Sequence, residues 1–144
     1  RRTYPFSVFH RHAVDVSDPL AHLAERGLPL TKLHGDQKPG GYPLEELATL
    51  PGVSLTASND HDFELVPAGV NKGRTLALLA LMWGIPLERC AAVGDSANDL
   101  EMLRAVGRPI AMGNAAPQVQ AAAAYTVADN SHDGAAQAIL SCLE

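Results

Sequence analysis

The sequence has few cysteines, few aromatic residues and no long apolar run. Its 144 residues include only two cysteines, Cys90 and Cys142, so we expect no disulfide framework and a reducing, cytoplasmic environment. No stretch is long and apolar enough to span a bilayer and no signal peptide is recognisable, so we expect no membrane partner. The sequence begins with Arg1 rather than methionine, from which we expect a trimmed or internal start.

Basic residues are also scarce. The chain has 11 Lys and Arg against 16 Asp and Glu, a formal net charge of -5, and phosphate backbones select basic surfaces. We therefore expect no nucleic-acid partner. With 47% hydrophobic and 19% charged residues, the composition is that of a globular domain rather than a disordered segment.

The pattern of expected helices and strands changes near Pro67, and we predict a domain division between residues 1–66 and 67–144. The first half is irregular and indicates an α+β module. Its expected elements are a helix over 18–26, a strand over 28–33, a Gly/Pro loop over 35–43, a short helix over 43–50, and strands over 53–56 and 63–66 joined by a turn.

The second half alternates helix and strand in regular order. Its expected elements are helices over 72–83 and 98–106, a helix from Pro117, a helix over 134–143, and strands over 90–93, 109–112 and 125–127. Short apolar strands that alternate with helices predict an α/β fold, with a parallel sheet covered by helices on both faces. Three strands make a small sheet, so we expect an open edge at the strand over 90–93 unless other strands complete it.

The most informative run is Val93-Gly94-Asp95-Ser96-Ala97-Asn98-Asp99-Leu100-Glu101-Met102. Asp95 follows a buried strand, and Asn98 and Asp99 open the next helix. Ligands of open α/β sheets bind beyond the carboxyl ends of the strands. Carboxylates without soft ligands nearby suit a hard cation such as Mg²⁺, so the run predicts part of a metal and phosphate site.

Lys72 stands at the start of a predicted helix, where the helix dipole disfavours a cation. A lysine at this unfavourable position is explained if an anion binds to its ammonium group. Taken alone, such a lysine is more often a solvated surface residue, and a Gly-Asp pair after a strand is more often a turn or a helix cap. Only their combination changes that balance.

Four segments together resemble the haloacid dehalogenase superfamily, and within it the Cof-type phosphatases. The segments are Asn71-Lys72-Gly73, Gly94 to Asp99 with Met102, Ala111-Met112-Gly113-Asn114-Ala115, and Asp133-Gly134. The resemblance covers roughly residues 53 to 141. It implies the C-terminal half of a Rossmann-like parallel sheet, preceded by part of an α+β cap that covers the site and selects the substrate.

The resemblance also implies roles for four side chains. Lys72 would neutralise charge on the nucleophile and on the transferring phosphoryl group, and Asn98 would contact the phosphate or the substrate. Asp95 and Asp99 would serve the Mg²⁺ ion, Asp95 as a ligand and Asp99 by supporting the metal's waters or by orienting Lys72. The implied reaction is phosphomonoester hydrolysis through an aspartyl-phosphate.

The family's nucleophile motif, Asp-x-Asp-Gly, is absent from this sequence. The sole Asp-x-Asp is Asp60-His61-Asp62, which lacks the following glycine and which we interpret as a turn. Thr56 imitates the family's phosphate-binding Ser or Thr but falls within the cap, and Asp15 lacks a second aspartate. His10 and His12 have no further ligand spaced to close a metal site. We therefore expect this chain alone to be a poor phosphatase or none.

Several functions remain open from the sequence. The first is a Mg²⁺-dependent phosphatase acting on a small phosphorylated metabolite such as a sugar phosphate, with the nucleophile outside this chain. The second is a non-catalytic binding or assembly module, whose open sheet edge pairs with a missing N-terminal segment or with a second copy. The third is a pseudoenzyme that binds phosphate without turnover.

Overall fold

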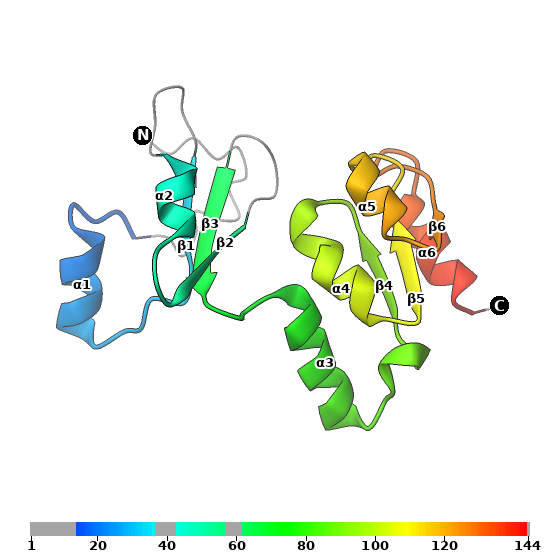
Figure 1. The fold of residues 1–144 in the computed structure, drawn as a ribbon, viewed down its shortest axis with the longest axis horizontal. Coiled ribbons are helices and arrows are strands. Elements are labelled where there is room, and N and C mark those ends of the chain that lie inside the picture. Colours follow the sequence, from blue (N-terminus) through cyan, green and yellow to red (C-terminus); the bar gives the residue numbers. More distant parts are fainter. Residues whose placement is uncertain (1–13, 37–42, 57–61, 144) are drawn as a thin grey trace. The chain divides into compact units, whose positions relative to one another are not determined.

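The computed structural model describes residues 14–36, 43–56 and 62–143, which fall into two compact units, Arg1–Thr31 and Lys32–Glu144 (Figure 1). The first unit contains helix α1 (Pro19–Arg26). The Asp18 side chain accepts a hydrogen bond from the Ala21 amide at 3.0 Å, and Gly27 ends the helix in the left-handed conformation, φ 60°. The domain division predicted between residues 66 and 67 stays a prediction.

The second unit begins with a three-stranded antiparallel sheet. Strand β3 (Asp62–Pro67) lies between β1 (Leu33–Asp36) and β2 (Val53–Thr56), and the short helix α2 (Leu44–Ala48) precedes β2. The prediction of a strand over 28–33 was wrong. The strand starts at Leu33, opposite Leu65 of β3, and runs into the segment expected to be loop, because pairing with β3 decides which residues become extended.

The rest of the unit is a parallel α/β fold, as the sequence predicts. Strands β4 (Ala91–Gly94), β5 (Arg108–Ala111) and β6 (Tyr125–Thr126) pair in that order. The helices are α3 (Lys72–Trp83), α4 (Leu100–Ala105), α5 (Pro117–Ala121) and α6 (Gly134–Ser141), with short 3-10 turns at Leu87–Arg89 and Ala97–Asp99. The helix predicted over 98–106 is therefore a 3-10 turn followed by an α-helix.

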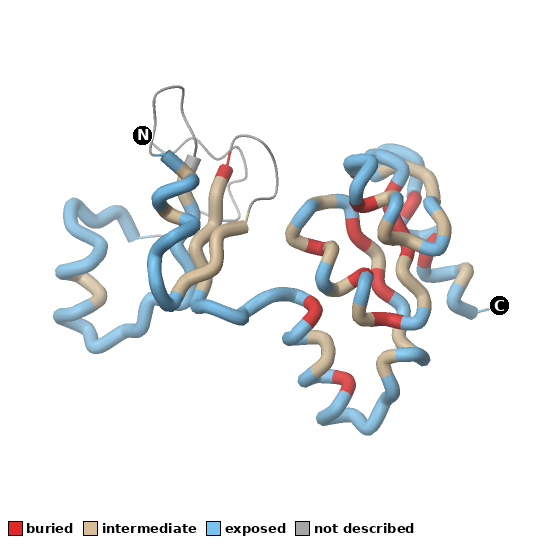
Figure 2. The backbone as a smooth tube through the Cα atoms, viewed as in Figure 1, coloured by how far each residue is buried: buried red, intermediate tan, exposed pale blue. Residues whose placement is uncertain are grey.

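Helices lie against both faces of the parallel sheet. One face packs on α4 and α5 through a cluster of buried residues, namely Ala92, Leu103, Val106, Ala111, Ala115 and Val119. The other face carries Ile110 and, paired with it on β6, Tyr125, whose hydroxyl lies 2.6 Å from the Ser141 hydroxyl of α6. Figure 2 shows the buried positions gathered in this part of the chain.

Strand β4 lies at an edge of the sheet. Among the described residues it pairs with β5 only, which confirms the open edge expected over 90–93. The carboxyl end of this edge strand leads directly into Asp95. Within the described ranges, no helix is both long and apolar enough to cross a membrane.

Leu103 of α4 tests the core. Leu103→Ala removes a side chain that is 0% exposed, and we expect it to lower the free energy of unfolding by about 2–5 kcal/mol through lost burial and a cavity. The matched control is Leu81→Ala in α3, which is 76% exposed and should cost less than about 0.5 kcal/mol. Urea unfolding followed by circular dichroism measures both, and equal losses would contradict this placement of the core.

Candidate active site at the carboxyl end of the parallel sheet

A tight turn after β4 forms the centre of the site. At Gly94 a Cβ atom would lie 2.6 Å from the Asp99 Cβ, so the residue at this position must be glycine for the chain to fold back on itself. Asp99 then accepts hydrogen bonds at its Oδ2 from the backbone amides of Asp95 (3.0 Å) and Ser96 (3.1 Å). Ser96 and Asp99 form a reciprocal capping box at the start of the 3-10 turn Ala97–Asp99.

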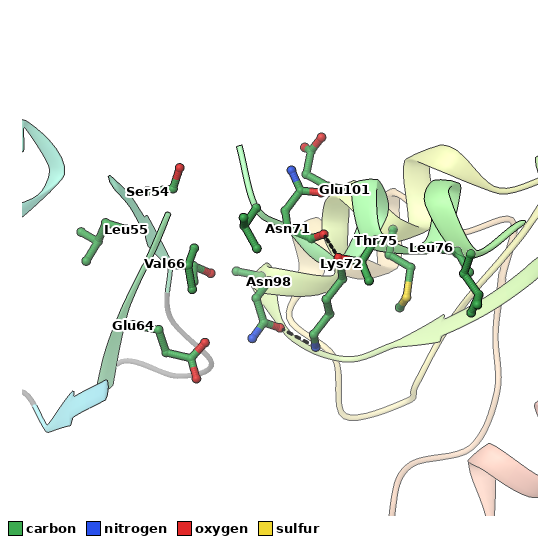
Figure 3. A pocket seen from close by; sticks show the side chains of 15 residues that line it. Ser54, Leu55, Glu64, Val66, Asn71, Lys72, Thr75, Leu76, Asn98 and Glu101 are labelled. Atoms are coloured by element: carbon green, nitrogen blue, oxygen red, sulfur yellow. Dashed lines mark hydrogen bonds between the residues drawn. The ribbon is translucent and has the colours of Figure 1, made fainter. Parts of the chain in front are cut away.

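Lys72 reaches this turn from the start of α3. Asn71 caps the helix by accepting a hydrogen bond from the Arg74 amide at 2.8 Å. Gly73 allows the close approach of α3 to α4, because a Cβ there would lie 2.5 Å from the Glu101 carbonyl oxygen. The Lys72 Nζ consequently donates to Asp99 Oδ1 at 2.5 Å. It also donates to Asn98 Oδ1 at 3.2 Å (Figure 3).

The Asp99 carboxylate is held ionised by these contacts. Its side chain is only 6% exposed, and burial by itself raises the pKa of the carboxyl group. The hydrogen bonds from Lys72 and from the amides of Ser96 and Asp95 outweigh that effect, so the pKa of Asp99 lies below its ordinary value. The folded protein therefore buries an anion that its own backbone and one lysine compensate.

Asp95 is placed differently. It is exposed at the end of β4, and its Oδ1 accepts a hydrogen bond from the Ser96 hydroxyl at 3.0 Å. Its Oδ2 accepts one from the Asn114 side-chain amide at 3.2 Å. Asn114 lies in one of the segments that carry the family resemblance, but the sequence analysis assigns no role to it. The signal was its position in the loop after the neighbouring strand β5.

The structure thus brings the predicted site residues to one loop. Lys72, Asn98 and Asp99 are in direct contact, and Asp95 joins them through its backbone amide. Their catalytic and metal-binding roles stay predictions. Among the described residues, no three His, Cys, Asp or Glu side chains gather closely enough to hold a metal ion by themselves.

The other candidates of the sequence analysis belong to other segments of the chain or lie outside the described residues, and of them Thr56 lines the same pocket as Lys72 and Asn98. His10, His12, Asp60 and His61 belong to segments that the structure does not describe. Asp62 is the first residue of β3, paired with Asp36. Asp15 is exposed in the first unit, and Thr56 pairs with Glu64 across β2 and β3.

A pocket of about 610 Å³ within the second unit includes Lys72 and Asn98 in its wall (Figure 3). This volume is in the range of small-molecule sites. The remaining lining residues are Ser54, Leu55, Thr56, Glu64, Val66, Val70, Asn71, Thr75, Leu76, Leu79, Ala97, Glu101 and Met102. The charged and amide side chains of this wall are the ammonium of Lys72, the amides of Asn71 and Asn98, and the carboxylates of Glu64 and Glu101.

Known proteins share this arrangement of sequence and fold. Residues 43–139 match the family model of the haloacid dehalogenase-like hydrolases. An HMP-PP phosphatase of Klebsiella pneumoniae (strain 342) is 40% identical over 121 residues, which are 83% of this chain and 43% of that protein. The chain spans less than half the length of the first curated relatives it matches.

Solved structures agree with the sequence matches. A haloacid dehalogenase-like hydrolase from Bacteroides thetaiotaomicron superposes with a TM-score of 0.72 and 34% identity, covering 89% of this chain and 48% of that one. A subclass IIB sugar phosphatase of the same superfamily superposes with a TM-score of 0.63 and 30% identity, covering 68% of this chain and 38% of that one.

The pair of Lys72 and Asp99 gives a pH-dependent prediction. Lys72→Met removes one donor from a buried carboxylate, and we expect the free energy of unfolding at pH 7 to fall by about 1 kcal/mol, since half of the lysine side chain is exposed and water replaces part of the bond. A depressed folded pKa stabilises the protein above the unfolded pKa of Asp, and this contribution is lost as pH falls through the folded value. The difference between the two proteins should therefore shrink below about pH 4.

Urea unfolding between pH 7 and pH 3 measures this effect. The control is Arg104→Met, which breaks an ion pair with Glu101 in which both side chains are more than half exposed. That variant should change stability by less than about 0.5 kcal/mol and leave the pH profile unchanged. A Lys72→Met penalty that stays constant down to pH 3 would contradict the ionised Asp99.

Proposed function

Because the chain belongs to the haloacid dehalogenase-like hydrolase family, we propose that it supplies part of the active site of a Mg²⁺-dependent phosphatase of the Cof type. The observation that carries the proposal is the contact of the Lys72 Nζ with Asp99 Oδ1 and Asn98 Oδ1, on the loop that Asp95 opens. A cation, an amide and a carboxylate then lie together beyond the carboxyl end of a parallel strand, which is where such folds bind ligands.

Phosphoryl transfer leaves a protein little covalent work and much positioning and charge neutralisation. In our proposal the Lys72 ammonium neutralises charge on the transferring phosphoryl group and on the nucleophile. The Asn98 side chain contacts the phosphate or the substrate. Both line the pocket, so both are accessible to a bound anion.

We propose that Asp95 is the residue of this chain that holds Mg²⁺. Its carboxylate is exposed and offers oxygen ligands, which fit this ion, whereas both oxygens of Asp99 already accept hydrogen bonds from Lys72 and two amides. Of the two roles foreseen for Asp99, orienting Lys72 therefore fits these contacts better than serving the metal. The bound ion would supply positive charge that offsets the charge of the phosphoryl oxygens.

The nucleophile of this phosphatase would lie in a segment outside the present sequence, since no Asp-x-Asp-Gly occurs in it. We propose that residues 1–66 are part of a cap, and that residues 67–144 are the C-terminal half of the core. The substrate would be a small phosphorylated metabolite. This class is consistent with the relatives' names, an HMP-PP phosphatase and a sugar phosphatase, and with the volume of the pocket.

The open edge of β4 supports a second candidate, a non-catalytic assembly module. In that case the chain forms a dimer in size-exclusion chromatography. Calorimetric titration with Mg²⁺ and phosphate then gives the same result for the native chain and for Asp95→Asn. Binding of both ligands without turnover, in a protein that includes the upstream segment, would instead identify a pseudoenzyme.

Hydrolysis of an aryl phosphate tests the leading proposal. We expect the 144-residue chain to show no turnover with Mg²⁺, and turnover to appear when an N-terminal segment carrying Asp-x-Asp-Gly is added to it. In that longer protein Lys72→Met should lower kcat by about 10²–10³-fold, because it removes a cation from the developing charge. Arg104→Met, which lies outside the pocket lining, is the control and should leave kcat unchanged.

Two results would contradict this proposal. Turnover by the 144-residue chain that disappears with Asp60→Asn would show that Asp60-His61-Asp62 is the nucleophile motif rather than a turn. An active longer protein that is indifferent to both Lys72→Met and Asp95→Asn would remove the present loop from the chemistry.

A further inference from the structure

We infer that Asn114 is a positioning residue that fixes the carboxylate of Asp95. The inference rests on the proposed function, because it gives Asp95 a ligand to meet. It starts from three loops that follow the three parallel strands in turn: Asp95 after β4, Asn114 after β5 and Asn130 after β6. Their contacts form a line along one end of the sheet.

The line consists of two hydrogen bonds. The Asn114 Nδ2 donates to Asp95 Oδ2 at 3.2 Å, and the Asn130 backbone amide donates to Asn114 Oδ1 at 3.0 Å. A backbone N–H can only donate, so it fixes which end of the Asn114 amide faces it. The NH₂ group must then face Asp95, and the side chain cannot reverse without losing both bonds.

Both loops that hold Asn114 are themselves tied down by glutamines. The Gln120 amide nitrogen donates to the carbonyl oxygens of Gly113 (3.2 Å) and Ala115 (3.0 Å), on either side of Asn114. In the third loop the Gln137 side chain accepts from the Ala128 amide at 3.1 Å and donates to the His132 carbonyl at 3.4 Å. The loop that carries Asn114 and the loop that supplies its Asn130 donor are therefore both held in place by side-chain to backbone hydrogen bonds.

The two loops also touch directly. The Gly113 amide donates to the Ala128 carbonyl oxygen at 3.1 Å, and a Cβ on Gly113 would lie 2.8 Å from the Asp129 backbone nitrogen. Any larger residue at position 113 would push the loops apart and carry Asn114 away from its donor. Glycine at this position thus belongs to the same arrangement.

These contacts restrain the side chain of Asp95. Its Oδ2 is held by Asn114 and its Oδ1 by the Ser96 hydroxyl, so an exposed side chain is restrained at both oxygens. Each oxygen keeps a further lone pair for a cation. Asn114 is not among the residues that line the pocket, so it acts on a ligand through Asp95 rather than by contact. Partners of this kind are worth about 10–100-fold in metal affinity.

Nuclear magnetic resonance of the 144-residue chain tests the positioning directly. In the native chain the three-bond Hα–Hβ couplings of Asp95 should report one fixed χ1 rotamer, and in Asn114→Ala they should average. Asn114→Asp keeps an acceptor for the Asn130 amide but loses the donor, so it should also release Asp95 while leaving the Asn130 amide signal in place. The matched control is Gln118→Ala, which truncates an exposed amide side chain on α5 and should leave the couplings unchanged.

Titration with Mn²⁺, followed by electron paramagnetic resonance, separates this inference from the proposed function. We expect Asn114→Ala to weaken Mn²⁺ binding about tenfold, Asp95→Asn to abolish it, and Gln118→Ala to leave it unchanged. If Asp95→Asn leaves Mn²⁺ binding unchanged, the proposed metal role of Asp95 is refuted. The positioning of Asp95 by Asn114 is then still decided by the Hα–Hβ couplings of Asp95. Asp95 couplings that are the same in the native chain and in Asn114→Ala would overturn the inference.

Discussion

The buried carboxylate of Asp99 is the group on which the site depends. It accepts hydrogen bonds from Lys72, from the Asp95 amide and from the Ser96 amide, and these bonds join α3 to the turn after β4. An anion with a 6% exposed side chain is costly unless every bond is made. The same bonds that compensate its charge also fix the backbone of Asp95 and the ammonium of Lys72. Compensation of the buried charge and placement of the Asp95 backbone and the Lys72 ammonium therefore rest on one set of contacts.

Local signals predicted the second half of the chain well. Helix α3 has the predicted bounds because Asn71 caps its start and Gly84 ends it, and both effects lie within a few residues of the helix. Strand β1 was misplaced for the opposite reason. Its extent is set by β3, whose Leu65 pairs with Leu33 from 32 residues away in the chain, and no local pattern carries that information.

In the site, too, local features could be predicted from the sequence, whereas contacts between distant segments could not. That Asp95 stands at the end of a strand could be inferred from the apolar run before it, but the meeting of Lys72 with Asp99 was implied only by the family resemblance. The bond from Asn114 to Asp95 was not foreseen, because it requires the loops after β4 and β5 to converge at a known distance. Parallel pairing of Gly94 with Ala111 brings them together.

The contacts of Asp99 also differ in how much chain each one closes. Its bonds to Asp95 and Ser96 span four and three residues, whereas its bond to Lys72 spans 27. Short loops close with little loss of chain entropy and long ones with more. Closing the turn after β4 therefore costs less chain entropy than joining Lys72 to Asp99. Of the three contacts of the anion, the one that brings its charge partner is the one whose loop costs the most to close.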